Sequence, residues 1–126
     1  MGWEVKNEGL FVVFSRDIPK IITNWLAPNV SRFLESHHVK LEELEHFVLH
    51  PGGKKVLEAY QECLGMETNK LDTSFQVLKE YGNMSSATVL YVLKEIMEKN
   101  PDKGDKGIAA ALGPGFSSEM LLLEWE

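Results

Sequence analysis

Short apolar segments alternate along this chain with longer segments whose apolar residues recur every three or four positions. The segments 9–15, 47–49, 108–112 and 120–125 have the length and composition of strands, and we expect 9–15 to be buried on both faces. The last two flank a glycine-rich turn. Strands that alternate with helices and end in a hairpin predict an α/β fold, with a mixed sheet of about four strands packed with helices.

The segments between these strands predict helices. One should end near Ser36, and Pro28 must kink it or split it in two. Others are expected over 56–64, with Gly65 as the residue that ends the helix, and over 70–81. From Met84 onward two adjacent apolar stripes leave little polar surface, so we expect this helix to be central and buried.

Composition places the chain among ordinary globular proteins. Its 126 residues suffice for one domain or part of one, and 44% are apolar and 25% charged. The net charge of −6 argues against a nucleic-acid-binding surface. No apolar segment approaches the roughly 20 residues that a membrane-spanning helix requires, and no export signal is apparent. Since the single cysteine, Cys63, cannot form an internal disulfide, we expect a cytoplasmic protein.

His50 is the first residue that could carry chemistry. It follows the apolar segment 47–49 and precedes Pro51-Gly52-Gly53, which puts it at the carboxyl end of a strand. Open α/β sheets bind ligands at that end. Neutral imidazole can accept a proton and imidazolium can donate hydrogen bonds near neutral pH. The alternative is a turn residue that only bonds to backbone.

Asn83 lies where one predicted helix ends and the next begins. Its side chain could cap the second helix, or it could present its amide N–H groups to a developing oxyanion. Gly113-Pro114-Gly115 similarly allows two interpretations. It could be a hairpin turn, or a loop that approaches a substrate without intervening side chains.

The other titratable residues predict no site. His37, His38 and His46 have no carboxylate or cysteine at metal-ligand spacing, so we expect no metal and expect these rings to face solvent or a strand edge. Cys63 lies in mid-helix on an apolar stripe, away from any helix N-terminus, and is expected to be a buried structural thiol. The residues alone therefore indicate an acid–base group and an oxyanion donor without a nucleophile.

Three motifs in order resemble the C-terminal half of the chalcone and stilbene synthase family, the type III polyketide synthases. They are His50-Pro51-Gly52-Gly53, the segment 80–87 (EYGNMSSA) and the segment 113–117 (GPGFS). The resemblance extends from about Gly9 to the last strand and implies that 1–126 form the C-terminal domain, one half of a thiolase-like fold. In that fold two α/β halves pack together with the active site between them. The family nucleophile is a cysteine of the N-terminal half, which these residues do not include.

The resemblance also implies roles for individual residues. His50 and Asn83 would complete a Cys-His-Asn triad for the decarboxylative condensation of malonyl-CoA onto an acyl-CoA starter. The implied substrate-binding residues are Leu10, Val12, Ser85, Gly113, Pro114 and Gly115, with Gly52 and Gly53 near the pantetheine arm of coenzyme A. Val12 stands where plant members usually carry a gating phenylalanine, and Ala111-Leu112 replace the usual Gly-Phe. Fatty acyl starters are therefore as consistent with the sequence as the plant starter.

The implied partners are the two thioesters acyl-CoA and malonyl-CoA, the N-terminal half of the same enzyme, and a second copy in a homodimer. No further cofactor is implied. We expect the chain alone to be inactive, to expose apolar surface and to self-associate. Two alternatives remain: a non-catalytic domain for acyl-CoA binding or oligomerisation, and half of a ketoacyl-carrier-protein synthase. The second kind of enzyme typically follows the histidine with Gln-Ala-Asn, where this chain has Pro-Gly-Gly.

Overall fold

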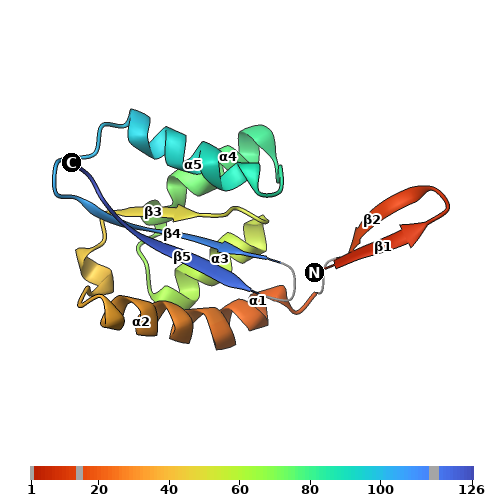
Figure 1. Cartoon of the computed structure of the whole chain (residues 1–126), viewed down its shortest axis with the longest axis horizontal. Coiled ribbons are helices and arrows are strands. Elements are labelled where there is room, and N and C mark those ends of the chain that lie inside the picture. The colour runs from red at the N-terminus through yellow and green to blue at the C-terminus, as the bar shows by residue number, and fades with distance from the viewer. Residues whose placement is uncertain (1, 14–15, 114–116) are drawn as a thin grey trace.

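The computed structural model describes residues 2–13, 16–113 and 117–126. It consists of an α/β body and a two-stranded hairpin that projects from one end of the body (Figure 1). The body contains a sheet with helices on both faces, so the predicted α/β class with a mixed sheet is confirmed. Among the described residues, no helix is both long enough and apolar enough to cross a membrane.

The sheet of the body has three strands rather than about four. Their order is β3 (His46–Leu49), β4 (Lys106–Leu112) and β5 (Ser118–Glu124). β3 runs parallel to β4, with Leu49 opposite Ala110, and β4 runs antiparallel to β5. The three strands at 47–49, 108–112 and 120–125 are therefore confirmed. Because β3 and β4 are parallel, their carboxyl ends lie at the same end of the sheet.

The fourth expected strand is not part of this sheet. β2 (Gly9–Val13) pairs with β1 (Gly2–Lys6), which we did not predict, in a separate antiparallel hairpin. The expectation that 9–15 is buried on both faces is wrong for the described part, because Leu10 is 67% exposed. The register places Trp3, Val5 and Leu10 on one face of the hairpin, and the first two are 62% and 79% exposed. An apolar strand pattern identified the strand but not its neighbours.

The first helical region is split at the expected place. α1 (Ile18–Ile21) continues through a π-helical segment, η1 (Ile22–Leu26), into α2 (Ala27–Ser36). Pro28 lies in the first turn of α2. Proline lacks an N–H group and its ring clashes with the carbonyl four residues earlier, so the wider turn before it accommodates the ring. The predicted end at Ser36 is confirmed.

The remaining helices follow the sequence pattern in position. They are η2 (Leu41–Glu43), α3 (Lys54–Leu64), η3 (Thr68–Leu71), α4 (Asp72–Tyr81) and α5 (Ala87–Glu98). Gly65 ends α3 in the left-handed conformation, with φ of 59°, as predicted. The expectation that α5 is buried all round is wrong. Val92 and Ile96 pack against the sheet, but Leu90 and Met97 are 63% and 57% exposed.

The sheet separates two apolar clusters because successive side chains of a strand point to opposite faces. Phe47 and Leu49 of β3 face the larger cluster, formed with η1, α2 and α3. Val48 faces the smaller one, formed with α4 and α5. Figure 1 shows α2 below the sheet and α4 with α5 above it. This packing on both faces fixes the direction in which each strand end points.

Candidate active site

His50 directly follows β3, at the carboxyl end that the sequence predicts. Its backbone N–H donates to the Ala110 carbonyl of β4 at 3.0 Å, which extends the parallel ladder by one residue. The N–H of Gly52 then donates to the His50 carbonyl at 3.0 Å and tightens the turn. A Cβ atom on Gly52 would lie 3.7 Å from Cδ2 of the His50 ring, so the ring lies directly beside this turn.

Asn83 meets this turn from the connection between α4 and α5. Its Nδ2 donates to the Gly52 carbonyl at 3.2 Å, and its Oδ1 accepts from the N–H of Ser85 at 2.9 Å. Asn83 therefore does not cap α5, which begins at Ala87 without a side-chain cap. The amide instead joins two loops that are 31 positions apart in the sequence. Because His50 and Gly52 follow β3, this bond brings Asn83 to the end of the sheet where His50 lies.

Two buried hydroxyls hold these loops, and sequence reasoning missed both. Ser74 of α4 is fully buried and donates to the Leu49 carbonyl at 2.9 Å, which anchors the last residue of β3. Thr88 of α5 is also fully buried; its Oγ1 accepts from Met84 N–H at 2.7 Å and donates to the Ser85 carbonyl at 2.9 Å. The partners of Thr88 lie only three and four positions earlier in the sequence. Because threonine often bonds to nearby backbone in this way, the sequence from Ser85 to Thr88 could have predicted these bonds.

The His50 imidazole is half-buried, and burial lowers its pKa from the ordinary value of 6.5. Burial acts in this direction because a charged imidazolium loses hydration when it leaves water. At neutral pH the ring is therefore uncharged, with one nitrogen that donates a hydrogen bond and one that accepts. Among the described residues, neither ring nitrogen of His50 nor the second amide hydrogen of Asn83 has a hydrogen-bond partner. These groups remain available to a bound molecule.

Gly113 lies at the matching end of β4, where its N–H donates to the Ser117 carbonyl at 2.8 Å. A Cβ atom at Gly113 would come within 2.7 Å of Oγ of the Ser117 side chain and 3.9 Å from its carbonyl oxygen. This bond continues the antiparallel pairing of β4 and β5, which ends at Leu112 and Ser118. Pro114 and Gly115, the other two predicted residues of the motif, lie outside the described residues.

The remaining predicted site residues fall into two groups. Ser85 is exposed beside Asn83, with a φ of 62° that the hydrogen bond to Asn83 Oδ1 supports, and Gly52 and Gly53 follow His50. Leu10 and Val12 are not brought to this end of the sheet by contacts within the body, because both belong to the projecting hairpin.

His46 and Cys63 make structural contacts that do not resemble those of catalytic groups. His46 does not simply face solvent: its Nε2 lies 2.8 Å from Asp105 Oδ2, and its ring packs on Trp125 at a centroid distance of 4.7 Å. Cys63 is half-buried, and its thiol donates to the Tyr60 carbonyl at 3.7 Å. Burial raises the pKa of this thiol, which disfavours the nucleophilic thiolate. No cluster of three metal-ligating side chains occurs in the part of the chain that the structure describes.

Comparisons with known proteins identify the family and the fold of this chain. The model of the family described as "Chalcone and stilbene synthases, C-terminal domain" matches residues 1–125. A chalcone synthase-like protein of Bacillus subtilis (strain 168) is 46% identical over 127 residues, and the alignment covers all of this chain and 35% of that protein. The 1,3,6,8-tetrahydroxynaphthalene synthase of Streptomyces peucetius is 36% identical, over 99% of this chain and 33% of its own length.

The fold matches as well. The crystal structure of 1,3,6,8-tetrahydroxynaphthalene synthase from Streptomyces coelicolor A3(2), a bacterial type III polyketide synthase, superposes with a TM-score of 0.92 at 28% identity. The superposition covers 99% of this chain and 36% of that one. The chain thus spans about a third of the length of the relatives that it matches.

Proposed function

Because this chain belongs to the chalcone and stilbene synthase family, as its C-terminal domain, we propose that it supplies His50 and Asn83 to the active site of a type III polyketide synthase. The nucleophile would come from the other half of the full-length enzyme. The observation that carries the proposal is the hydrogen bond from Asn83 Nδ2 to the carbonyl of Gly52, two residues after His50. This bond holds the Asn83 carboxamide at the end of the sheet where the His50 imidazole also lies.

The proposed chemistry places both groups around a thioester oxygen. Loss of CO₂ from malonyl-CoA leaves the electron pair of the broken C–C bond on an enolate, whose oxygen carries the negative charge. Hydrogen bonds from His50 and Asn83 would stabilise that oxygen in a site that excludes water. The enolate carbon then attacks the carbonyl of the enzyme-bound acyl thioester. A C–C bond forms, the C–S bond breaks, and the thiolate leaves with the electron pair.

The protonation state of His50 suits this role. Since burial lowers its pKa, the ring is neutral near pH 7 and carries one N–H donor. A neutral donor stabilises a developing oxyanion without releasing a full proton to it. Thioesters of coenzyme A are the proposed substrates, with Gly52 and Gly53 leaving space for the pantetheine arm. We also infer a homodimeric, cytoplasmic enzyme.

The names of two relatives support a proposal for the class of product. One is named for 1,3,6,8-tetrahydroxynaphthalene, and a phloroglucinol synthase of Pseudomonas fluorescens is 33% identical over 98% of this chain. Both names denote small aromatic compounds with several hydroxyl groups. We propose a product of this class for the full-length enzyme.

The test uses the full-length enzyme with malonyl-CoA and an acyl-CoA starter. His50→Gln and Asn83→Ala should each lower kcat by about 100-fold or more, the loss expected when a donor to a developing oxyanion is removed. His37→Gln and Asn24→Ala are matched controls, since both side chains are exposed and neither belongs to the site. Wild-type activity in both site variants would refute the proposal.

A further inference from the structure

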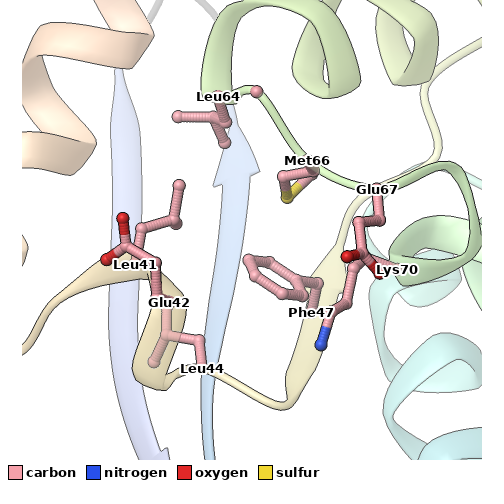
Figure 2. A pocket seen from close by; sticks show the side chains of 9 residues that line it. Leu41, Glu42, Leu44, Phe47, Leu64, Met66, Glu67 and Lys70 are labelled. Atoms are coloured by element: carbon pink, nitrogen blue, oxygen red, sulfur yellow. The ribbon is translucent and has the colours of Figure 1, made fainter.

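A cavity lies at the opposite end of β3 from His50. It has a volume of about 320 Å³ and opens to solvent between η2, the end of α3 and η3 (Figure 2). Its lining residues are Leu41, Glu42, Leu44, Phe47, Leu64, Gly65, Met66, Glu67 and Lys70. None of the predicted active-site residues belongs to it. A cavity of about 150 Å³ already holds a benzene ring, so this one has room for one or two rings.

The interior of the cavity is apolar. Leu44 and Phe47 are almost fully buried, and Leu41, Leu64 and Met66 are half-buried around them. In Figure 2 the Phe47 ring and the Met66 thioether lie next to each other. An aromatic ring and a polarisable sulfur both make favourable contacts with a flat aromatic ligand. The interior therefore favours a planar ring over a polar or charged group.

The rim of the cavity is charged, with more acid than base. Glu42 lies on one side, on η2, and Glu67 and Lys70 lie on the other, around η3 (Figure 2). The ammonium of Lys70 is within 4.0 Å of a further carboxylate, Glu45. Carboxylates only accept hydrogen bonds, so an anionic ligand would be repelled and one with hydroxyl donors would be favoured.

We propose that this cavity binds a small, uncharged aromatic compound that carries hydroxyl groups. The ring would pack against the half-buried side chains of Leu41, Leu64 and Met66, and its hydroxyls would donate to Glu42 and Glu67. This is the class of compound proposed above as the product, so the cavity would act as a product-binding site away from the reaction centre. That second statement rests on the proposed function, whereas binding itself depends only on the cavity.

The probe is phloroglucinol, 1,3,5-trihydroxybenzene, titrated into the full-length enzyme while its backbone amide resonances are recorded by NMR. We expect saturable shifts of residues around Phe47 and Met66, with a Kd on the order of 1 mM for so small a ligand. 1,3,5-Trimethoxybenzene has the same ring without donors and should bind at least about fivefold more weakly. Equal affinity of the two probes, or shifts only around His50, would overturn the proposal.

Variants separate the cavity from the reaction centre. Glu67→Gln keeps the shape of an exposed side chain but removes its charge, and should weaken phloroglucinol binding about fivefold. Glu62→Gln, on the exposed surface of α3 and outside the cavity, is the matched control and should bind as wild type does. Leu41→Trp should fill the space and abolish the shifts. If Glu67→Gln and Leu41→Trp both bind like wild type, the cavity is not the site.

His50→Gln distinguishes this proposal from the proposed function. It should leave phloroglucinol binding at the cavity unchanged while it lowers turnover of the full-length enzyme. Cavity binding without any effect of His50→Gln on turnover would refute the function alone. If His50→Gln lowered turnover as expected but phloroglucinol caused no shifts at the cavity, the proposed cavity site alone would be refuted.

Discussion

The Thr88 hydroxyl supports the position of Asn83 through the turn that lies between them. It accepts from Met84 N–H and donates to the Ser85 carbonyl, and so closes the turn that follows Asn83. Thr88→Val keeps the shape of the side chain but removes both hydrogen bonds. We expect this substitution to loosen the turn and to free the amide from Gly52.

The magnitude follows from the exposure of the three groups. Thr88 is fully buried, Met84 is half-buried and Ser85 is exposed. Each lost hydrogen bond removes about 1 kcal/mol of net stability, and water can still reach the Ser85 side of the turn. The expected destabilisation is therefore about 2 kcal/mol, or roughly 8 °C in Tm for a chain of this length. Thr88→Ser keeps the hydroxyl, loses a buried methyl and should be destabilised by about 1 kcal/mol.

Urea denaturation measures these differences, and amide hydrogen exchange localises them. In Thr88→Val the Met84 amide should lose its protection and the Asn83 side-chain resonances should shift, whereas Thr88→Ser should preserve both. If Met84 stayed protected in the valine variant, or if the two variants lost equal stability with unchanged Asn83 signals, the hydroxyl would not hold the turn.

Two further predictions concern other positions. The pKa of His50 is lower in the folded chain than its ordinary value of 6.5, so the unfolded chain takes up this proton first as pH falls. The stability contribution of neutral His50 is thus fully present above pH 6.5 and is lost below it, and urea midpoints from pH 7.5 to 5 should fall less steeply in His50→Gln. Gly107→Ala should destabilise the body by about 1–3 kcal/mol, because a Cβ atom there would lie 2.8 Å from the His46 carbonyl and 2.9 Å from the Trp125 ring. An unchanged thermal midpoint would show that β4 shifts freely at this point.

Local signals in the sequence predicted most elements of the body. Gly65 marked the end of α3 because a residue with positive φ is needed there, and Pro28 marked the change of helix type because its ring excludes a regular turn. Each of these constraints acts within a few residues. The carboxyl-end position of His50 followed in the same way, from a short apolar strand and the turn after it.

The parts that could not be predicted depend on contacts between distant residues. The hydrogen bond between His46 and Asp105 spans 59 positions, and the bond of Ser74 to Leu49 spans 25. Neither residue type specifies such a partner. The contact of Asn83 with the turn after His50 also joins two loops, where spacing alone allowed a helix cap or a turn. The structure places the two loops in contact through Gly52.

The hairpin and α5 also show that an apolar pattern does not identify the surface that covers it. Both segments have the apolar pattern of buried elements, yet Trp3, Val5, Leu10 and Leu90 are largely exposed. An isolated two-stranded hairpin is marginally stable in water, so a covering surface is needed to hold it in a functional protein. In this family the domain partners with the N-terminal half of the same chain, and the relatives are about three times as long as this one. We expect that half to cover both surfaces.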